Sequence, residues 1–152
     1  MMKVTIAALG CIFVALADDM GVARKMSENK FAPLPGLPAC ATLAVESGDP
    51  SQGASVILLK GPAGCRIPWH WHTATEQIMM VSGSSKVQMQ DTGQTSSLGP
   101  GGYAMMPSKH VHQFTCASAC AAFVSSNAAF DIHYVDAKGS EIPLETALSK
   151  KK

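Results

Sequence analysis

Three residues capable of binding a metal ion lie close together near the middle of the chain: His70, His72 and Glu76. On a β-strand, residues two apart point to the same face, so the two imidazoles can be directed at one point. Glu76 begins a second apolar run, which we expect to form the returning strand of a hairpin and to bring its carboxylate back to that point. Imidazole nitrogens together with a carboxylate suit a divalent transition metal.

The residues around these three resemble the first motif of the cupin superfamily. That motif consists of a Gly, five residues, His-x-His, three or four residues, a Glu, six residues and a second Gly. In this sequence its fixed places are filled by Gly64, His70, His72, Glu76 and Gly83. Because every fixed place is filled, the resemblance at this stretch is specific.

A later stretch resembles the second cupin motif in part. Gly101, Pro107 and His112 stand at the places that the motif requires. Lys109 stands where a Gly is usual, and Cys116 stands where an Asn is usual. These two departures concern the shape of a turn and the end of a strand, and they leave the histidine in place.

The resemblance covers residues 40–136, the size of one cupin barrel. It implies an all-β fold, the double-stranded β-helix or jelly-roll barrel, made of two facing antiparallel sheets. It also implies a metal site built by four side chains: His70, His72, Glu76 and His112.

Alternation along the strands predicts which side chains surround this site. If the histidines of the first motif point inward, Trp69 and Trp71 point outward, where they would mark a subunit contact in a homodimer. Inward positions on the later strands are expected to line an apolar substrate pocket, formed by Ile78, Met80, His110 and Phe114. For His110 we also expect a position at the surface or behind a metal ligand.

A metal held by three imidazoles and a carboxylate keeps open positions, which allow Lewis-acid chemistry or dioxygen activation. Iron, manganese, nickel, copper and zinc all accept these ligands. Arg66 is the only Arg near the first motif, so a strongly anionic substrate is not expected. The expectation is a dioxygenase-like metalloenzyme acting on a small neutral or apolar organic substrate. Two alternatives stay open: a non-catalytic cupin that binds or senses a ligand, and an isomerase with His110 as its base.

Composition indicates a globular chain of a single domain. Of its 152 residues, 47% are hydrophobic and 15% are charged, and the formal net charge is +1. A chain of this length buries a core without help from cross-links. It has no basic stripe with interleaved aromatic residues, so nucleic acid is not an expected partner.

The first 17 residues are typical of a secretory signal peptide. Lys3 precedes an apolar run that reaches Leu16, and the run ends in a small-x-small cleavage site at Ala17. The run is short for a membrane span. We therefore expect export to the periplasm or the medium, without membrane attachment after cleavage. The alternatives are a buried N-terminal strand or helix and, less favoured, a lipoprotein with Cys11 as acceptor.

Cleavage after the signal would remove Cys11 and leave four of the five cysteines. An even number in an oxidising compartment suggests disulfides, and four cysteines allow three pairings. Cys116 and Cys120 flank a short loop between two apolar runs, and in a hairpin they would face each other. Cys40 and Cys65 would then be the remaining pair.

Short apolar runs separated by Gly and Pro turns predict strands through most of the chain. Besides the two strands of the first motif, we expect strands over 43–46, 54–60, 85–90, 103–106, 110–116, 121–125 and 130–135. A loop is expected over 91–102 and a short helix over 142–149. The expected organisation is a signal peptide (1–17), an extended arm (18–39), one barrel (40–136) and a C-terminal tail (137–152).

Overall fold

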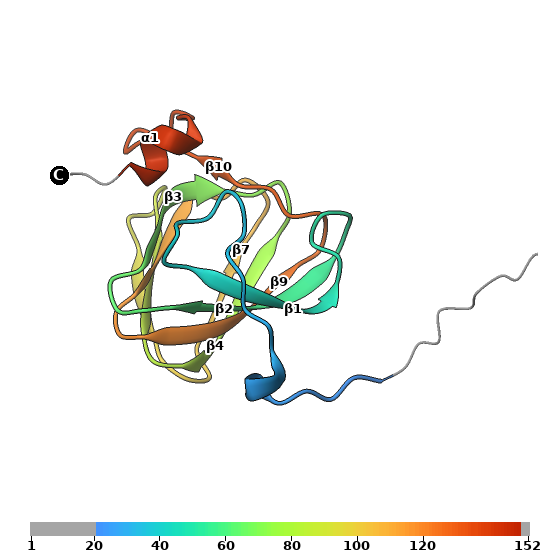
Figure 1. The fold of residues 1–152 in the computed structure, drawn as a ribbon. Helices are drawn as coiled ribbons and strands as arrows, with labels where there is room; N and C mark the ends of the chain where they lie inside the picture. The colour runs from blue at the N-terminus through green and yellow to red at the C-terminus, as the bar shows by residue number, and fades with distance from the viewer. Residues whose placement is uncertain (1–20, 150–152) are drawn as a thin grey trace, which may run out of the picture.

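Two facing antiparallel β-sheets make up the body of the protein (Figure 1). The computed structural model describes residues 21–149. The elements in this part of the chain are η1 (Met26–Glu28), β1 (Thr42–Gly48), β2 (Ser55–Gly61), β3 (Arg66–Trp71), β4 (Glu76–Ser82), β5 (Ser85–Met89), β6 (Thr95–Leu98), β7 (Tyr103–Met106), β8 (His112–Cys116), β9 (Cys120–Ser126), β10 (His133–Tyr134) and α1 (Leu144–Leu148).

Each sheet has five strands, and strands that are consecutive in the chain often belong to different sheets. The first sheet has the order β1-β2-β9-β4-β7, and the second has the order β10-β3-β8-β5-β6. All the pairs are antiparallel. The predicted all-β barrel of two facing sheets is therefore confirmed.

Alternation of side chains between the core and the outside explains why these segments form strands. In β4, Glu76, Ile78 and Met80 are buried, while the residues between them are partly exposed, as a period of two requires. Buried side chains from both sheets, such as Ile78 of β4 and Phe114 of β8, meet in one hydrophobic core.

The two strands of the first motif do not form a hairpin, so that prediction is wrong. β3 pairs with β8 and β10, whereas β4 pairs with β7 and β9 in the facing sheet. Alternation shows which face a residue occupies, but it does not show which distant strand lies alongside. Glu76 nevertheless reaches the histidines, because the segment 72–75 crosses from one sheet to the other.

Other boundaries also differ from the predictions. Part of the expected loop 91–102 is the edge strand β6, whose mostly Ser and Thr side chains hide it from a pattern based on apolar residues. β8 begins at His112 rather than at residue 110. Only His133–Tyr134 of the expected strand 130–135 pairs as β10, because the preceding residues hydrogen-bond to the loop after β3 instead.

The described part of the N-terminal arm crosses the barrel beside β1 (Figure 1). Ala32 pairs with Leu43 through an isolated bridge, and Leu34 and Leu37 pack against the core. The Tyr134 hydroxyl donates a hydrogen bond to a carbonyl of the arm at 2.7 Å. The predicted signal peptide lies outside the described residues. Between residues 21 and 149, no helix has the length and apolar character needed to cross a bilayer.

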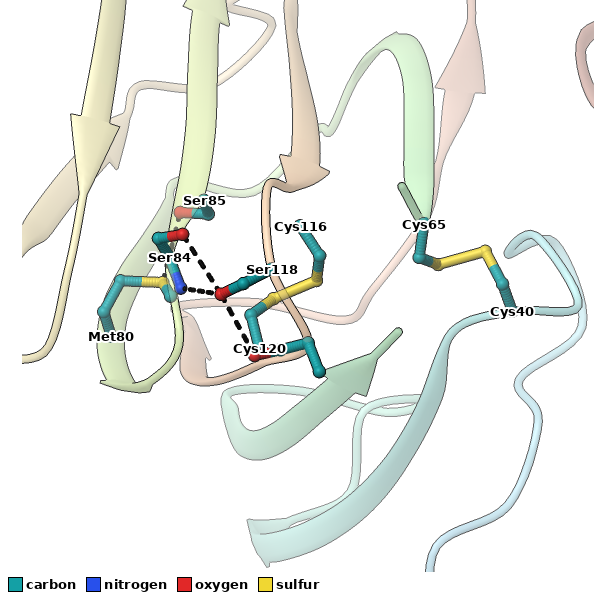
Figure 2. Close-up of a disulfide and its surroundings, with 9 residues drawn as sticks. Cys40, Cys65, Met80, Ser84, Ser85, Cys116, Ser118 and Cys120 are labelled. Atoms are coloured by element: carbon teal, nitrogen blue, oxygen red, sulfur yellow. Dashed lines mark hydrogen bonds between the residues drawn. A yellow bond between two sulfur atoms is a disulfide. The ribbon is translucent and has the colours of Figure 1, made fainter. Parts of the chain in front are cut away.

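The described chain has two disulfides, and both pairings suggested by the sequence are confirmed (Figure 2). Cys40 and Cys65 join the end of the arm to the start of β3. Cys116 and Cys120 join the end of β8 to the start of β9. Because β8 and β9 belong to different sheets, this second bond links the two sheets, and the expected hairpin between these cysteines does not exist.

Candidate metal centre

Four potential ligands converge between the two sheets. His70 lies in β3, His72 follows it directly, Glu76 opens β4 and His112 opens β8. His70 and His112 are direct partners in the β3–β8 ladder, and the carboxylate comes from the facing sheet. Their ligand atoms all lie within 4.8 Å of one another, and none of the four residues is more than 9% exposed. The structure thus brings together the four residues that the sequence singled out.

The three imidazoles are held in one orientation through their Nδ1 atoms. Each Nδ1 donates a hydrogen bond to a main-chain carbonyl: His70 to Pro68 at 2.6 Å, His112 to His110 at 2.9 Å, and His72 to Asp131. A neutral imidazole that carries its proton on Nδ1 presents Nε2 as a metal ligand. The Nε2 of His72 is buried and has no hydrogen-bond partner among the described residues. A bound cation would satisfy this atom.

The Glu76 carboxylate faces two of these rings. Its Oε2 is 3.1 Å from Nε2 of His112, and its Oε1 is 3.5 Å from Nε2 of His72. Burial alone would raise the pKa of Glu76, but its contacts with His72 and His112 outweigh burial and lower the pKa to about 2. Burial, followed by the neighbouring histidines, lowers the pKa of His70 well below its usual value. An ionised carboxylate and a neutral imidazole are the forms that bind metals.

This donor set fits a divalent transition metal. Three imidazole nitrogens and one carboxylate oxygen are ligands that iron, manganese, nickel, copper and zinc accept. The hydrogen bonds behind each ring supply the outer support that metal-binding histidines normally have. The four side chains converge on one point, and an octahedral ion there would retain coordination positions for a small molecule.

A small apolar cavity lies beside His72 and Glu76. Its volume is about 10 Å³, which is room for about one water molecule. The other lining residues come from the arm, β1, the β1–β2 loop, β2, β9 and the segments next to β4 and β9: Leu34, Leu43, Pro50, Ser55, Ile57, Ala74, Val124, Ser126 and Phe130. This lining contains no Lys or Arg, so an uncharged occupant suits the cavity.

The residues expected to line a substrate pocket lie away from this cavity. Ile78, Met80 and Phe114 are buried in the core cluster and do not border it. His110 precedes β8, and its Nε2 lies 3.3 Å from Oδ1 of Asp91. His110 does not border the cavity. Alternation identified inward positions, but the arm and the segment after β9 determine which inward positions border the cavity.

The departures from the second motif each have a structural counterpart. Lys109 has φ of 62°, the left-handed conformation that glycine adopts most easily. Its N–H donates to the carbonyl of His72 at 2.8 Å, and its Nζ lies 5.8 Å from the ring centroid of Trp71. Cys116 is used in the disulfide that joins the sheets. The turn that presents His112 is therefore formed without the usual glycine.

Trp71 is partly covered by its own chain. Its ring stacks on the ring of His133, with 3.8 Å between centroids. The exposed large hydrophobic side chains of the described residues lie elsewhere and include Tyr103 and Met105 on β7 and Phe123 on β9. A subunit contact through the two tryptophans stays a prediction.

A family model for the ChrR cupin-like domain matches residues 19–129, which include all four potential ligands. The chain belongs to this cupin family. The resemblance seen in the two motifs is thereby confirmed, and cupin membership accounts for the two-sheet barrel around the histidines.

Solved structures agree with this assignment. The polyketide cyclase RemF from Streptomyces resistomycificus aligns with a TM-score of 0.67 and 18% identity, over 85% of this chain and 99% of that one. A putative acetylacetone dioxygenase from Methylibium petroleiphilum aligns with a TM-score of 0.60 and 16% identity, over 86% and 95% of the two chains. An RmlC-like cupin from Shewanella frigidimarina aligns with a TM-score of 0.58 and 12% identity, over 68% and 87%. Such low identities establish the fold alone. A comparison with curated proteins found no match.

Sequence reasoning missed the residues that close the cavity and support His72. Leu34, Pro50 and Phe130 belong to three separate segments and share no motif. Asn127 and Asp131 carry a weak signal, because Asn and Asp in irregular segments often accept hydrogen bonds from main-chain N–H groups. The sequence does not reveal that those N–H groups belong to the loop between His72 and Glu76.

Proposed function

We propose that this cupin is an exported, metal-dependent dioxygenase that acts on a small, uncharged, largely apolar organic molecule. The metal ligands are His70, His72, Glu76 and His112. The observation that carries the proposal is the convergence of these side chains, with each imidazole fixed through Nδ1 and with an apolar cavity beside two of them.

A bound transition metal supplies Lewis acidity and, when it is redox-active, activation of dioxygen. The protein's own part is orientation and exclusion of water. The main-chain carbonyls hold the imidazole rings, and the ionised Glu76 balances part of the cation's charge. The apolar walls disfavour water and charged molecules. Incorporation of both oxygen atoms of O₂ into the product requires no external reductant, so the cupin barrel alone suffices.

The closed cavity limits how the substrate reaches the metal. A volume of about 10 Å³ is too small for an organic substrate, since ligand sites normally enclose some hundreds of Å³. The substrate must therefore displace the side chains of Leu34, Pro50 and Phe130, which lie at the wall in three different loops. These walls favour a compact apolar body.

Export is part of the proposal for two reasons. The first 17 residues have the order of regions typical of a signal peptide, and the two disulfides suit an oxidising compartment. The periplasm or the medium is the proposed location.

One observation favours a second candidate, a cupin that binds a metal or ligand without turnover. Apart from the four metal ligands, no described residue at the cavity offers an acid or base. The isomerase alternative has less support, because His110, its intended base, faces Asp91 rather than the cavity.

Metal content decides the first step of this proposal. The parent protein, His70→Ala and the matched control His110→Ala are purified from the exported fraction and analysed for metals. Near-stoichiometric metal is expected in the parent and in His110→Ala, with loss in His70→Ala. Absence of metal from all three, even after reconstitution, would refute the metal site.

Oxygen uptake then separates the two candidates. The loaded parent is tested with a panel of phenolics and β-diketones, and we expect one O₂ consumed for each substrate molecule oxidised. A loaded protein that is stabilised by a panel compound but consumes no oxygen with any of them would instead establish a binding protein, because a ligand of the native state raises apparent stability.

A further inference from the structure

His72 differs from the other two imidazoles in the partner of its Nδ1–H. His70 and His112 each donate to the carbonyl two residues earlier in the chain, so local backbone geometry sets their rings. His72 donates to the carbonyl of Asp131, 59 residues away, in the irregular segment 127–132 between β9 and β10. The direction of His72 therefore depends on how that segment is held.

Asp131 itself fastens this segment to the residue after His72. Its Oδ1 accepts a hydrogen bond from the N–H of Thr73 at 2.8 Å, and its Oδ2 lies 3.4 Å from Nε2 of His133. Asp131 thus binds the His72 ring with its carbonyl and the adjacent main chain with its carboxylate. The carboxylate side chain is 37% exposed, so its truncation leaves no cavity in the core.

Two more contacts place the same segment against the site. The N–H of Thr75 donates to Oδ1 of Asn127 at 3.0 Å. The ring of Phe130 lies 5.1 Å from the ring of His72, between centroids, and also lines the cavity. One segment therefore supports the ligand loop and forms part of the substrate wall.

We propose that Asp131 is a positioning residue that directs Nε2 of His72 at the metal. When its carboxylate is removed, the segment loses its bond to Thr73 N–H, the Asp131 carbonyl shifts, and the His72 ring is free to rotate or to move its proton to Nε2. The other two imidazoles keep their local partners. This inference rests on the proposed function to the extent that His72 is a metal ligand.

The test compares Asp131→Ala with the conservative Asp131→Asn and with the matched control Asp136→Ala. Asn keeps an oxygen that accepts from Thr73. Asp136 makes the same kind of bonds, since its Oδ1 accepts from the N–H groups of Lys138 and Ser140, but it does not contact any of the four potential metal ligands. Nitrogen NMR of the imidazole rings in metal-free protein reports the tautomer of each histidine, and competition with a chelator measures the affinity for zinc.

We expect Asp131→Ala to change the ring signals of His72 alone and to weaken zinc binding about 10- to 100-fold, as the loss of an outer support does in other metal sites. Asp131→Asn and Asp136→Ala should match the parent. Unchanged His72 signals, or equal changes at His70 and His112, would overturn the positioning role even in a protein that binds zinc. A parent that binds no metal, with His72 signals altered only by Asp131→Ala, would refute the metal function but show that Asp131 orients the His72 ring.

Discussion

The Cys40–Cys65 disulfide should contribute more to stability than the Cys116–Cys120 disulfide. The cross-linked cysteines are 25 residues apart in the first pair and 4 apart in the second. A disulfide restricts the unfolded chain, and the restriction grows with the length of the loop that it closes. On this basis the first bond contributes about 3.5 kcal/mol to the free energy of unfolding and the second about 2 kcal/mol.

Urea unfolding of two double variants, Cys40→Ala/Cys65→Ala and Cys116→Ala/Cys120→Ala, measures both contributions. Loss of core packing should destabilise the second variant more than the first, because Cys116 and Cys120 are both buried whereas Cys40 is partly exposed. This effect opposes the order of stability predicted from loop length. A larger loss in the first variant is therefore a stringent result. The reasoning from loop length is refuted if the first variant loses no more free energy than the second.

The same comparison has a consequence at the cavity. Cys40 ends the arm that carries Leu34 to the cavity wall. The variant without this bond should open the cavity more often, and a small apolar probe should bind to it faster than to the variant without the Cys116–Cys120 bond. Equal binding rates in stopped-flow experiments would show that the disulfide does not restrain Leu34.

Two further experiments concern the backbone at Lys109 and the protonation of His70. Lys109→Gly should be about 1 kcal/mol more stable than Lys109→Ala in thermal or urea unfolding. Both variants lose the contact with Trp71, but only glycine relieves the strain of the left-handed backbone at this position. Equal stability of the two variants would contradict this prediction. The second experiment concerns pH. Because the pKa of His70 is lowered on folding, the unfolded chain binds its proton more readily, and the stabilisation present above the unfolded pKa is lost as pH falls. As the pH falls from 7.5 to 5.5, chelator-treated protein should lose unfolding free energy through this group, on the order of 1 kcal/mol. His70→Gln should lack this loss, and identical pH profiles of the two proteins would refute the prediction.

Much of the fold was predictable because β-strands carry a local signal. The alternation in β4 and the apolar run in β2 located strands to within about two residues, which is the usual uncertainty of an element boundary. β6 was missed because an edge strand of Thr and Ser buries too little apolar surface to produce the pattern. The false hairpin between β3 and β4 has a different cause: the free energy that selects a strand's neighbour comes from contacts far along the chain, and no local pattern records it.

In the candidate site, too, residues within one local stretch were predictable and residues brought together by the fold were not. His70, His72 and Glu76 follow from spacing within one stretch, and His112 follows from the resemblance to the second motif. Phe130 and Asp131 could not be found in this way, because their relation to His72 exists only after the chain has folded back across the barrel. The expected pocket at Ile78, Met80 and Phe114 shows the limit of alternation: it separates inside from outside, but it does not separate a filled core from a cavity.

The bonds from His70 and His112 to carbonyls two residues earlier have a consequence for how this protein can change. Both ring orientations are encoded in the main chain, and a main-chain carbonyl is present whatever side chain the residue carries. Substitutions at the cavity wall, whether by natural drift or by design, can therefore alter what the cavity accepts without disturbing these two histidines. His72 is the exception, since the segment that orients it also carries the Phe130 wall. Efforts to give this barrel a new specificity should begin at Leu34 and Val124 and leave residues 127–131 unchanged.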